Sequence, residues 1–502
     1  MIRSFLRVVL HRSYLNLFFR VILCAALTSA GAQVSTANIN GMVEDGSGAR
    51  IPNVKIKLLN LLTGTENVAL AGNDGAFAVP GVLPGDYSMQ VERAGFATIE
   101  FSGLTLHVGD LKSFRIRMRI GTVNERIDVD ASALALNTDG ASVNSVVERH
   151  FVMNIPLNGR SFQDLISMTP GVIPQSPQVG TPGNFGVNGQ RADQNSYLVD
   201  GVSANIGPGP LDGNKLLPSA GQFAGTTSLG TTQGLVSLDA LQEFRALSSS
   251  YSAEYGRTPG GQFTLLTRSG TDQLHGSSYA FLRNSYFDAS DWFAGFNQRA
   301  GHIYFYQQDV GGTLSTPIVL PFVRKAPDKP FFFGSYEELH VLQPMAPMVQ
   351  YVPDSNLRKD AATQTQALIA AFPVLYNGSN TSGLESFVSL QESLPSFVKS
   401  LDLRLDRKLS ERVSAFVRFG DTRSGSQTRQ LSSLSNTTLN STTLTAGATA
   451  QTSARASDET RFGYATSGSE RSTALNLYEG YAVRGSSQPT NLAAALGAPC
   501  AK

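Results

Sequence analysis

Apolar and polar side chains alternate at a period of two along residues 37–120, between short turn signals. Val54, Ile56 and Leu58 fall on one face, and Lys55 and Lys57 fall on the other. The same alternation returns in two further apolar sets, Tyr87, Met89, Val91 and then Phe114, Ile116, Met118, Ile120, the second interleaved with Arg115, Arg117 and Arg119. A period of two is typical of strands with one buried face. Glycine- and aspartate-rich turns divide the region into about seven short strands, which predicts a β-sandwich.

Residues 121–271 carry longer segments punctuated by glycine, with two helix signals. Phe162, Leu165 and Ile166 stand at helical spacing after Ser161, a possible N-cap. Asp239 followed by Gln242 is a capping-box pattern, which predicts a short helix there. Strands are expected at Tyr197–Val199, Phe244–Leu247 and Phe263–Thr267. Together these elements predict a small α+β unit.

Alternation returns strongly after residue 400. Leu401, Leu403 and Leu405 are interleaved with Asp402, Arg404 and Asp406, and a turn around residues 410–412 leads into Val413, Ala415, Val417 and Phe419. This predicts a hairpin with one apolar and one polar face, as expected where one side meets lipid and the other a wet lumen. Soluble sandwiches show the same alternation, so the hairpin alone leaves both classes open. Residues 344–396 and 426–440 are predicted to be long loops.

The N-terminus has the pattern of an export signal. Arg3, Arg7, Arg12 and Arg20 precede the apolar run Val21–Leu27, and Ala30-Gly31-Ala32 offers small residues for cleavage after Ala32. The alternative is an uncleaved anchor that includes Tyr14–Phe19. Cleavage removes Cys24 and leaves Cys500 alone, so no internal disulfide is expected.

Composition and motifs narrow the function. The net charge of +1 and the 16% of charged residues argue against a nucleic-acid partner, which requires a basic face. The chain contains no H-E-x-x-H, G-x-S-x-G or Walker A string, and its six histidines are scattered. We therefore expect no enzyme activity, no cofactor and no metal site.

The N-terminal region resembles the carboxypeptidase regulatory-like domain. The resemblance rests on Gly41-Met42-Val43-Glu44-Asp45, Ile51-Pro52-Asn53-Val54, Gly75-Ala76-Phe77, Leu83-Pro84-Gly85-Asp86-Tyr87 and Val91-Glu92-Arg93-Ala94-Gly95-Phe96. It implies a transthyretin-like fold, grouped with carbohydrate-binding modules. It implies no peptidase activity, because the catalytic domain that such modules accompany is absent.

The next region resembles the plug domain of TonB-dependent receptors, of the Oar-like branch. The motifs occur in the family's order: Leu157-Asn158-Gly159-Arg160, Thr169-Pro170-Gly171-Val172, Tyr197-Leu198-Val199-Asp200-Gly201, Tyr251-Ser252-Ala253-Glu254-Tyr255-Gly256-Arg257, Gly260-Gly261 and Thr267-Arg268-Ser269-Gly270. Gln262-Phe263-Thr264 departs from the usual two aliphatic residues and Asn, but it preserves a strand. The plug-motif residues expected to matter are Asn158, Gly159, Arg160, Asp200, Gly201, Glu254, Tyr255, Gly256, Arg257, Gly260 and Gly261.

Residues 275–337 then resemble the first barrel strands of that branch, and Glu125-Arg126-Ile127-Asp128-Val129 resembles the TonB box. In the family this box is the segment through which an inner-membrane partner pulls on the plug, by adding an extended peptide to a sheet edge. We expect it to be extended and mobile. The alternative is an ordinary strand or linker, since short alternating segments are common.

The resemblance implies a mostly β fold: a transthyretin-like β-sandwich, a small α+β plug and a partial antiparallel transmembrane β-barrel. The expected domains are the signal at 1–32, the sandwich at 33–121, the TonB box and plug at 122–272, and an incomplete barrel with long loops at 273–502. A receptor of about 22 strands needs more residues than the 228 from His275 to Lys502, so a fragment of a longer receptor is expected, with a smaller barrel as the alternative.

The implied function is energy-coupled uptake of an extracellular ligand across the outer membrane, with the sandwich in the periplasm. The expected partners are a TonB-like inner-membrane energy-coupling protein, outer-membrane lipid and an unidentified ligand, for which a glycan is one candidate. The alternative function is a carbohydrate-binding or adhesion protein of the outer membrane or cell surface.

Overall fold

The computed structural model covers most of the chain between residues 36 and 475. The described ranges are 36–121, 125–131, 143–154, 163–174, 185–212, 215–218, 224–252, 255–256, 258–288, 304–318, 329–344, 349–370, 384–388, 393–410, 412–430, 433–453 and 456–475. The predicted signal and Cys500 lie outside these ranges.

The N-terminal unit is a sandwich of two sheets. Its strands are β1 (Ala37–Glu44), β2 (Lys55–Asn60), β3 (Glu66–Leu70), β4 (Ala76–Val82), β5 (Gly85–Glu92), β6 (Thr98–Leu106) and β7 (Leu111–Arg117), joined by an added strand β8 (Arg126–Asp130). One sheet has the order β4-β1-β7, and the other has the order β3-β2-β5-β6-β8. The predicted sandwich of about seven strands is therefore confirmed, and the structure adds an eighth strand at one edge.

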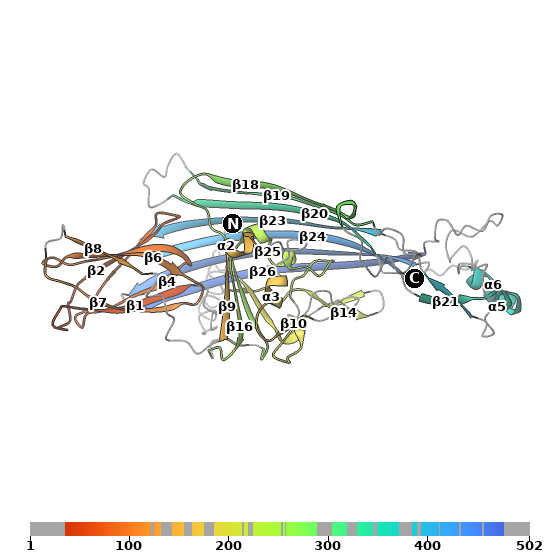
Figure 1. Ribbon diagram of the computed structural model, residues 1–502, viewed down its shortest axis with the longest axis horizontal. Coiled ribbons are helices and arrows are strands. Elements are labelled where there is room, and N and C mark those ends of the chain that lie inside the picture. The colour runs from red at the N-terminus through yellow and green to blue at the C-terminus, as the bar shows by residue number, and fades with distance from the viewer. Residues whose placement is uncertain are drawn as a thin grey trace, which may run out of the picture.

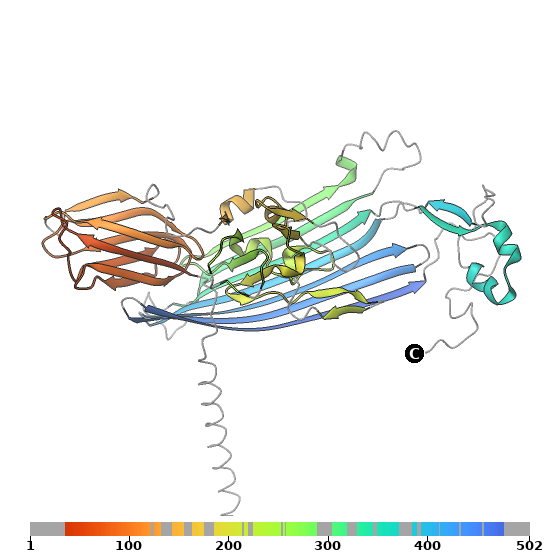
Figure 2. The same cartoon turned by 90° about the horizontal axis from the view of Figure 1, so that it is seen from below.

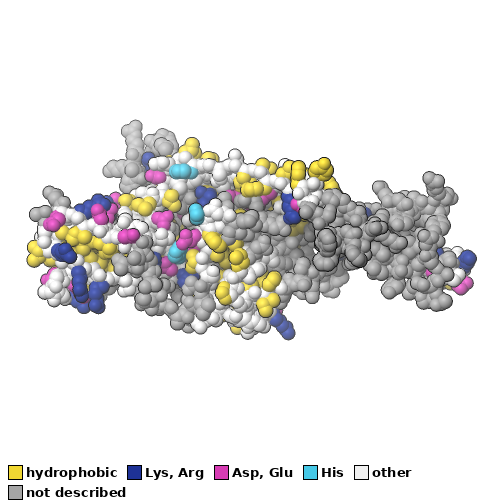
Figure 3. All heavy atoms as spheres, viewed as in Figure 1, with side chains coloured by type: hydrophobic (Ala, Val, Ile, Leu, Met, Phe, Trp, Pro, Cys, Tyr) yellow, Lys and Arg dark blue, Asp and Glu magenta, His cyan; other side chains and the backbone are white. Residues whose placement is uncertain are grey.

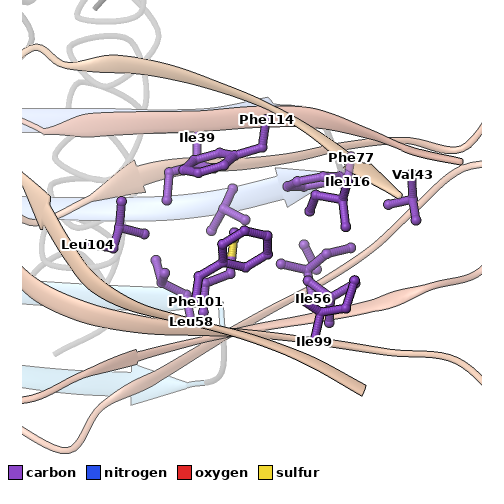
Figure 4. Packing of buried hydrophobic residues seen from close by; sticks show 14 of the residues in the cluster. Ile39, Val43, Ile56, Leu58, Phe77, Ile99, Phe101, Leu104, Phe114 and Ile116 are labelled. Atoms are coloured by element: carbon purple, nitrogen blue, oxygen red, sulfur yellow. The ribbon is translucent and has the colours of Figure 1, made fainter. Parts of the chain in front are cut away.

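Alternation builds the core of this sandwich. Ile56 and Leu58 from one sheet meet Ile39 and Phe114 from the other in the space between the sheets, as Figure 4 shows. Every second side chain of β2, β5 and β7 is buried, as predicted. Ile120 does not continue the pattern, because β7 ends at Arg117 and the Ile120 side chain is 87% exposed.

A mixed α+β unit follows, comprising the described residues between 143 and 267. We call it the plug, after the domain whose motifs it resembles in sequence. Its elements are β9 (Val143–Glu148), α2 (Arg149–Asn154), α3 (Gln163–Ser167), β10 (Val172–Pro174), β11 (Phe185–Val187), η3 (Ala192–Gln194), β12 (Ser196–Val199), β13 (Val202–Ser203), β14 (Pro208–Asp212), β15 (Lys215–Pro218), η4 (Thr232–Gly234), η5 (Leu238–Ala240), β16 (Leu241–Ser249) and β17 (Gln262–Thr267). The central sheet has the order β13-β12-β17-β16-β9. Phe263 stacks between Tyr197 and Phe244 in its core.

One plug helix and all three plug strands were predicted correctly, but the second helix was not. Leu165 and Ile166 are buried in α3, as expected. Asp239 does not begin a helix, because it lies inside the short turn η5 and the chain continues as β16. The side chain of Ser237 accepts a hydrogen bond from Ala240 N and so caps a single turn. Gln242 is therefore a strand residue and not part of a capping box.

A seven-stranded antiparallel sheet forms the wall of the molecule, and we call it the barrel sheet. Its order is β18-β19-β20-β23-β24-β25-β26. The strands are β18 (His275–Asn284), β19 (Tyr306–Pro317), β20 (Phe331–Pro344), β23 (Ser393–Ser410), β24 (Val413–Gln430), β25 (Ser433–Ser453) and β26 (Ala456–Leu475), with η6 (Ser285–Phe287) after the first. Among the described strands, β18 and β26 are the edges and do not pair with each other. The predicted mostly β fold is confirmed, with the sheet open.

Both predicted long loops contain regular structure. Residues 426–440 are not a loop, because β24 runs to Gln430 and pairs with β25 from Ser433 onward. The polar residues there continue both strands past the apolar part of the sheet. Residues 344–396 hold the hairpin β21 (Val349–Pro353) and β22 (Leu384–Val388) with helices α5 (Ser355–Asp360) and α6 (Thr363–Ala370), and β23 already begins at Ser393.

The units are arranged along one long axis. The sandwich lies at one end and the hairpin with α5 and α6 at the other (Figure 1). The plug lies against one face of the barrel sheet, between these ends (Figure 2). The last residues of β23 and β25 and the first residues of β24 and β26 lie at the end of the barrel sheet nearest the sandwich, where Lys408 Nζ donates to Glu66 O at 2.6 Å. In the described part of the chain, no helix has the length and apolar character needed to cross a bilayer.

Candidate functional site

Asp200 closes the end of the plug strand β12. Asp200 and Gly201 form a tight turn with φ values of 50° and 80°, the left-handed region that glycine enters freely and aspartate tolerates. The turn aims the Asp200 carboxylate at the end of β17, where it accepts hydrogen bonds from Thr267 N at 2.9 Å and Thr267 Oγ1 at 2.7 Å. The two strands are thereby joined at the ends where they leave the plug sheet.

The same carboxylate also joins the plug to the barrel sheet. Arg404 Nη1 on β23 donates to Asp200 Oδ1 at 3.0 Å, and its Nη2 lies 2.9 Å from Asp406 Oδ1. Arg418 Nε on β24 lies 3.9 Å from Asp200 Oδ2, and Arg418 Nη2 donates to Asp402. We call Asp200, Asp402, Arg404, Asp406 and Arg418 the plug–wall ion network.

The charged side chains of this network are almost completely buried, which makes their pairing energetically important. The side chains of Asp200, Arg404 and Arg418 are 1%, 3% and 3% exposed. Ions so fully removed from water are held only by their partners, and losing one partner leaves buried hydrogen-bonding groups unsatisfied. The network therefore fixes one end of the plug sheet against the wall.

A second line of contacts runs along the same wall. Ser228 N in the plug donates to Ser424 Oγ of β24 at 2.8 Å, and Thr422 Oγ1 donates to Gln233 O at 3.2 Å. Ser237 Oγ and Ser335 Oγ of β20 share a hydrogen bond of 3.3 Å. The plug segment from residue 228 to residue 237 thus crosses β20, β23 and β24, whose plug-facing side chains are polar.

Gly260 and Gly261 occupy the opposite end of the plug sheet from Asp200. They precede β17 where it pairs in parallel with the start of β12, whereas Asp200 follows the end of β12. A Cβ at Gly260 would lie 2.3 Å from Gln194 O, so only glycine permits this close approach. Tyr251 OH donates to Gly260 O at 3.0 Å and stabilises the same turn.

The plug-motif residues therefore do not form one site. Asp200 and Gly201 face the wall, while Gly260 and Gly261 support the far end of the sheet. Tyr255 packs edge-on against Tyr251 with ring centroids 6.1 Å apart, and the chain continues to Gly256. Of the motif residues predicted from sequence, Asn158, Gly159, Arg160, Glu254 and Arg257 lie outside the described residues.

The barrel half of the network was not predicted from the sequence. Asp402, Arg404 and Asp406 were recognised only as the polar face of a hairpin. Arg418 was not singled out, although it stands between Val417 and Phe419. The one signal in the sequence was three consecutive charged residues on the polar face of this strand, Asp402, Arg404 and Asp406. Such a density of charge is more than a strand facing only water in the lumen requires.

The segment Glu125–Val129, which the sequence predicts to be the TonB box, overlaps strand β8 at the edge of the sandwich. It runs parallel to β6, from Thr98 opposite Arg126 to Ser102 opposite Asp130. The segment is extended, as predicted, but it is paired along its described length and not free. Glu125, which precedes it, accepts a hydrogen bond from Thr98 N at 2.8 Å.

The sandwich meets the plug through His107. Its Nδ1 lies 3.2 Å from Glu243 Oε2 and its Nε2 lies 3.5 Å from Glu148 Oε1. The hydrogen bond to Glu243, and then the nearby carboxylates, raise the pKa of His107 above its usual value, against the opposing effect of burial. Arg245 Nη1 of the plug donates to Val108 O and lies 3.8 Å from Asp110 Oδ1.

The described residues contain no group of three or more His, Cys, Asp or Glu side chains that could hold a metal ion. The network of acids and bases at the wall is paired internally, so its arrangement suits mechanical attachment and not proton transfer to a substrate.

Comparison with known proteins agrees with this architecture. Residues 38–119 match the carboxypeptidase regulatory-like domain family, and residues 266–369 match the outer membrane beta barrel domain family. The TonB-dependent transporter Oar of Myxococcus xanthus is 22% identical over 223 residues, which are 43% of this chain and 19% of that protein. The chain thus spans about a fifth of the length of this curated relative.

Two solved structures align with part of this chain. The outer membrane transporter YddB of Escherichia coli aligns over 64% of this chain and 38% of its own, with 15% identity and a TM-score of 0.42. FpvA of P. aeruginosa, bound to heterologous pyoverdines, aligns over 70% of this chain and 46% of its own, with 12% identity and a TM-score of 0.39.

The family matches identify a carboxypeptidase regulatory-like domain at residues 38–119, followed by an outer membrane beta barrel domain matched over residues 266–369. The resemblance to TonB-dependent receptors of the Oar-like branch is confirmed, and the location is the outer membrane.

Proposed function

We propose that this chain is part of a TonB-dependent transporter that takes up an extracellular ligand across the outer membrane. The plug blocks the lumen at rest. A TonB-like protein of the inner membrane engages the TonB-box segment and pulls on the plug through the chain that follows it. The ligand binds at the outer end, where the hairpin β21–β22 and helices α5 and α6 project beyond the barrel sheet.

The observation that carries this proposal is the plug–wall ion network. A plug attached to the inner face of a membrane wall by a few buried ion pairs is fixed at rest, yet it can be released by breaking a small number of contacts. Asp200 alone contacts two strands of the barrel sheet, through Arg404 and Arg418. A rigid scaffold protein would not need a separate plug held in this way.

A test compares cells that produce the full natural receptor with cells that produce the same receptor carrying Ile127→Pro. Proline removes a backbone donor and disturbs the extended segment that strand addition needs. Mass spectrometry of a defined extract should show solutes depleted by the first strain and not by the second, while both bind the same solutes at the cell surface. Equal depletion by both strains would disprove coupling through this segment.

The alternative function, glycan binding by the sandwich, lacks a comparable observation. Glycan-binding sites commonly present exposed aromatic rings as stacking platforms. The large apolar side chains exposed on the described sandwich are aliphatic: Leu61, Leu62, Val68, Leu70, Leu111 and Ile120. Its position next to the box and the barrel rim favours a mechanical role for the sandwich.

A further inference from the structure

The strand β8 is a short addition to a sheet that is complete without it. Five consecutive residues of β8 pair with β6, and β8 is the last strand in the order β3-β2-β5-β6-β8. Ala131 N donates to Ser102 O at 2.8 Å just after the strand, and Arg126 Nη2 lies 2.9 Å from Glu100 Oε2. These contacts hold the segment in one register.

The apolar side of β8 faces the sandwich. Ile127 and Val129 are partly buried against the sandwich core, and Ala131 belongs to the core with 1% exposure. Arg126, Asp128 and Asp130 point to solvent. The side chains that an extended peptide would offer to a partner's pockets are therefore already occupied by the chain's own sandwich.

The sandwich also contacts both the barrel sheet and the plug. Lys408 Nζ at the end of β23 donates to Glu66 O, and Thr36 Oγ1 donates to Glu459 of β26. His107 and Arg245 join the sandwich to the plug. If the partner pulled on β8 while β8 is paired with β6, the force would act on the sandwich and on the ends of β23 and β26 that contact it, as well as on the plug. Directing force to the plug requires β8 to leave β6.

We propose that the edge of β6 at Thr98–Ser102 is a storage site for the TonB-box segment, and that this site and the energy-coupling partner compete for the same five residues. The sandwich then acts as an autoinhibitory module. The partner binds only the fraction of receptors in which β8 has peeled away, so its apparent affinity falls in proportion to that fraction. This inference rests on the proposed function, because it assumes that the segment is the box.

A disulfide across the β6–β8 pair tests the proposal. Glu100 and Asp128 are register partners, and both point away from the core, so Glu100→Cys with Asp128→Cys meets the distance that a disulfide requires. The pair is placed in the full receptor with Cys500→Ser. We expect the oxidised receptor to bind the partner's periplasmic domain at least about ten-fold more weakly than the reduced receptor. Reduction should restore binding and uptake.

The matched control places a disulfide between two other strands of the same sheet, so that β8 is not restrained. Lys55 and Glu92 are register partners on β2 and β5, and Lys55→Cys with Glu92→Cys should leave partner binding unchanged by oxidation. A second variant, Glu100→Lys, places like charges beside Arg126 and weakens storage. It should bind the partner roughly two- to five-fold more tightly, as the energies of exposed ion pairs suggest.

The results separate this inference from the proposed function. If oxidised and reduced Glu100→Cys/Asp128→Cys receptors bind the partner equally while Ile127→Pro abolishes binding, the segment is the box but β6 does not store it. The partner would then add to the open edge of β8. If neither the Glu100→Cys/Asp128→Cys disulfide nor Ile127→Pro changes partner binding, the assignment of this segment as the TonB box is wrong.

Discussion

At the scale of single residues, the chain places one carboxylate where two parts of the molecule meet. Asp200 adopts a backbone conformation that few residues other than glycine enter, with φ of 50°, and so brings its side chain between Thr267 of the plug and Arg404 of the wall. Its charge offsets cations that are almost completely removed from water. Removal of Asp200 should therefore leave buried hydrogen-bond donors without an acceptor on both the plug and the wall.

We expect Asp200→Ala to weaken the attachment of the plug by about 1–3 kcal/mol, because buried donors of Thr267 and Arg404 lose their acceptor. Arg404 and Arg418 keep their second carboxylate partners, Asp406 and Asp402. Hydrogen exchange of the receptor in lipid should show faster exchange of the amides of residues 200–203 and 265–267. The matched control is Asp421→Ala on β24, whose partner Arg423 is 68% exposed. An exposed pair contributes roughly 0–1 kcal/mol, so plug exchange should not change in that variant. Equal exchange in the two variants would refute the role of Asp200.

Two glycines of neighbouring plug motifs give a second prediction at this scale. A Cβ at Gly260 would meet Gln194 O at 2.3 Å, whereas a Cβ at Gly256 would meet nothing within 4 Å. Gly260→Ala should therefore force a backbone shift that costs about 1–3 kcal/mol, and Gly256→Ala should be close to neutral. Limited proteolysis of the plug in purified receptor would compare them. A Gly256→Ala plug that is cleaved as fast as the Gly260→Ala plug would contradict the prediction.

At the scale of strands and turns, the alternation of apolar and polar residues predicts where the strands lie, but not what covers each of their faces. Tyr87, Met89 and Val91 are buried, as their spacing of two residues indicates. The spacing is a local feature of the sequence, and the second sheet of the sandwich covers the apolar face that it marks. Asp402 and Arg404 are just as buried, although they lie on the polar face of β23, because the plug covers that face. No local pattern could reveal this, since Asp200 is 204 residues away from Arg404 in the chain.

The misassigned elements have the same cause. Asp239 has the sequence of a helix start, yet the residues after it pair on both sides, with β17 and with β9, and tertiary pairing overrides the local signal. Glu125–Val129 was correctly expected to be extended, but its pairing with β6 depends on where the chain returns after Gly121. Contacts between distant segments decide both cases.

The junction between the sandwich and the plug should respond to pH. The raised pKa of His107 means that its protonated form is favoured by the hydrogen bond to Glu243 and by Glu148 and Asp110. This stabilisation is fully present below the usual pKa of 6.5 and is lost as the pH rises through the raised pKa. Amides of residues 107–110, corrected for intrinsic exchange, should be less protected at about pH 8.5 than at about pH 6. His107→Gln should abolish the difference, and unchanged protection in the wild type would refute the prediction.

At the scale of the whole molecule, the barrel sheet separates a polar inner face from an apolar outer face. Leu403, Phe419, Leu444 and Tyr464 are register partners across four neighbouring strands, and Phe419, Leu444 and Tyr464 are all exposed. Two residues along the same face, the row changes to Asp421, Thr442 and Thr466. Figure 3 shows further apolar side chains along the upper edge of the molecule, where β18 and β19 lie. The outer face thus has an apolar band bordered by polar residues.

If this band contacts lipid, the cost of a charge on it depends on depth. An Arg facing lipid near the bilayer midplane of a membrane barrel costs about 2–4 kcal/mol, and the cost falls to roughly 0–1 kcal/mol near the interface. Leu444 lies inside the apolar row, and Thr442 lies on the same face of β25 in the polar row, where its Oγ1 donates to Asp421 at 2.7 Å. We therefore expect Leu444→Arg to reduce folding of the full receptor into lipid bilayers far more than Thr442→Arg. The fraction of heat-modifiable, unboiled protein on a gel measures this folding, and in detergent the two variants should fold alike. Equal losses for the two variants in bilayers would mean that the apolar row does not face the hydrocarbon, and that the outer surface of the sheet is covered by something other than the membrane.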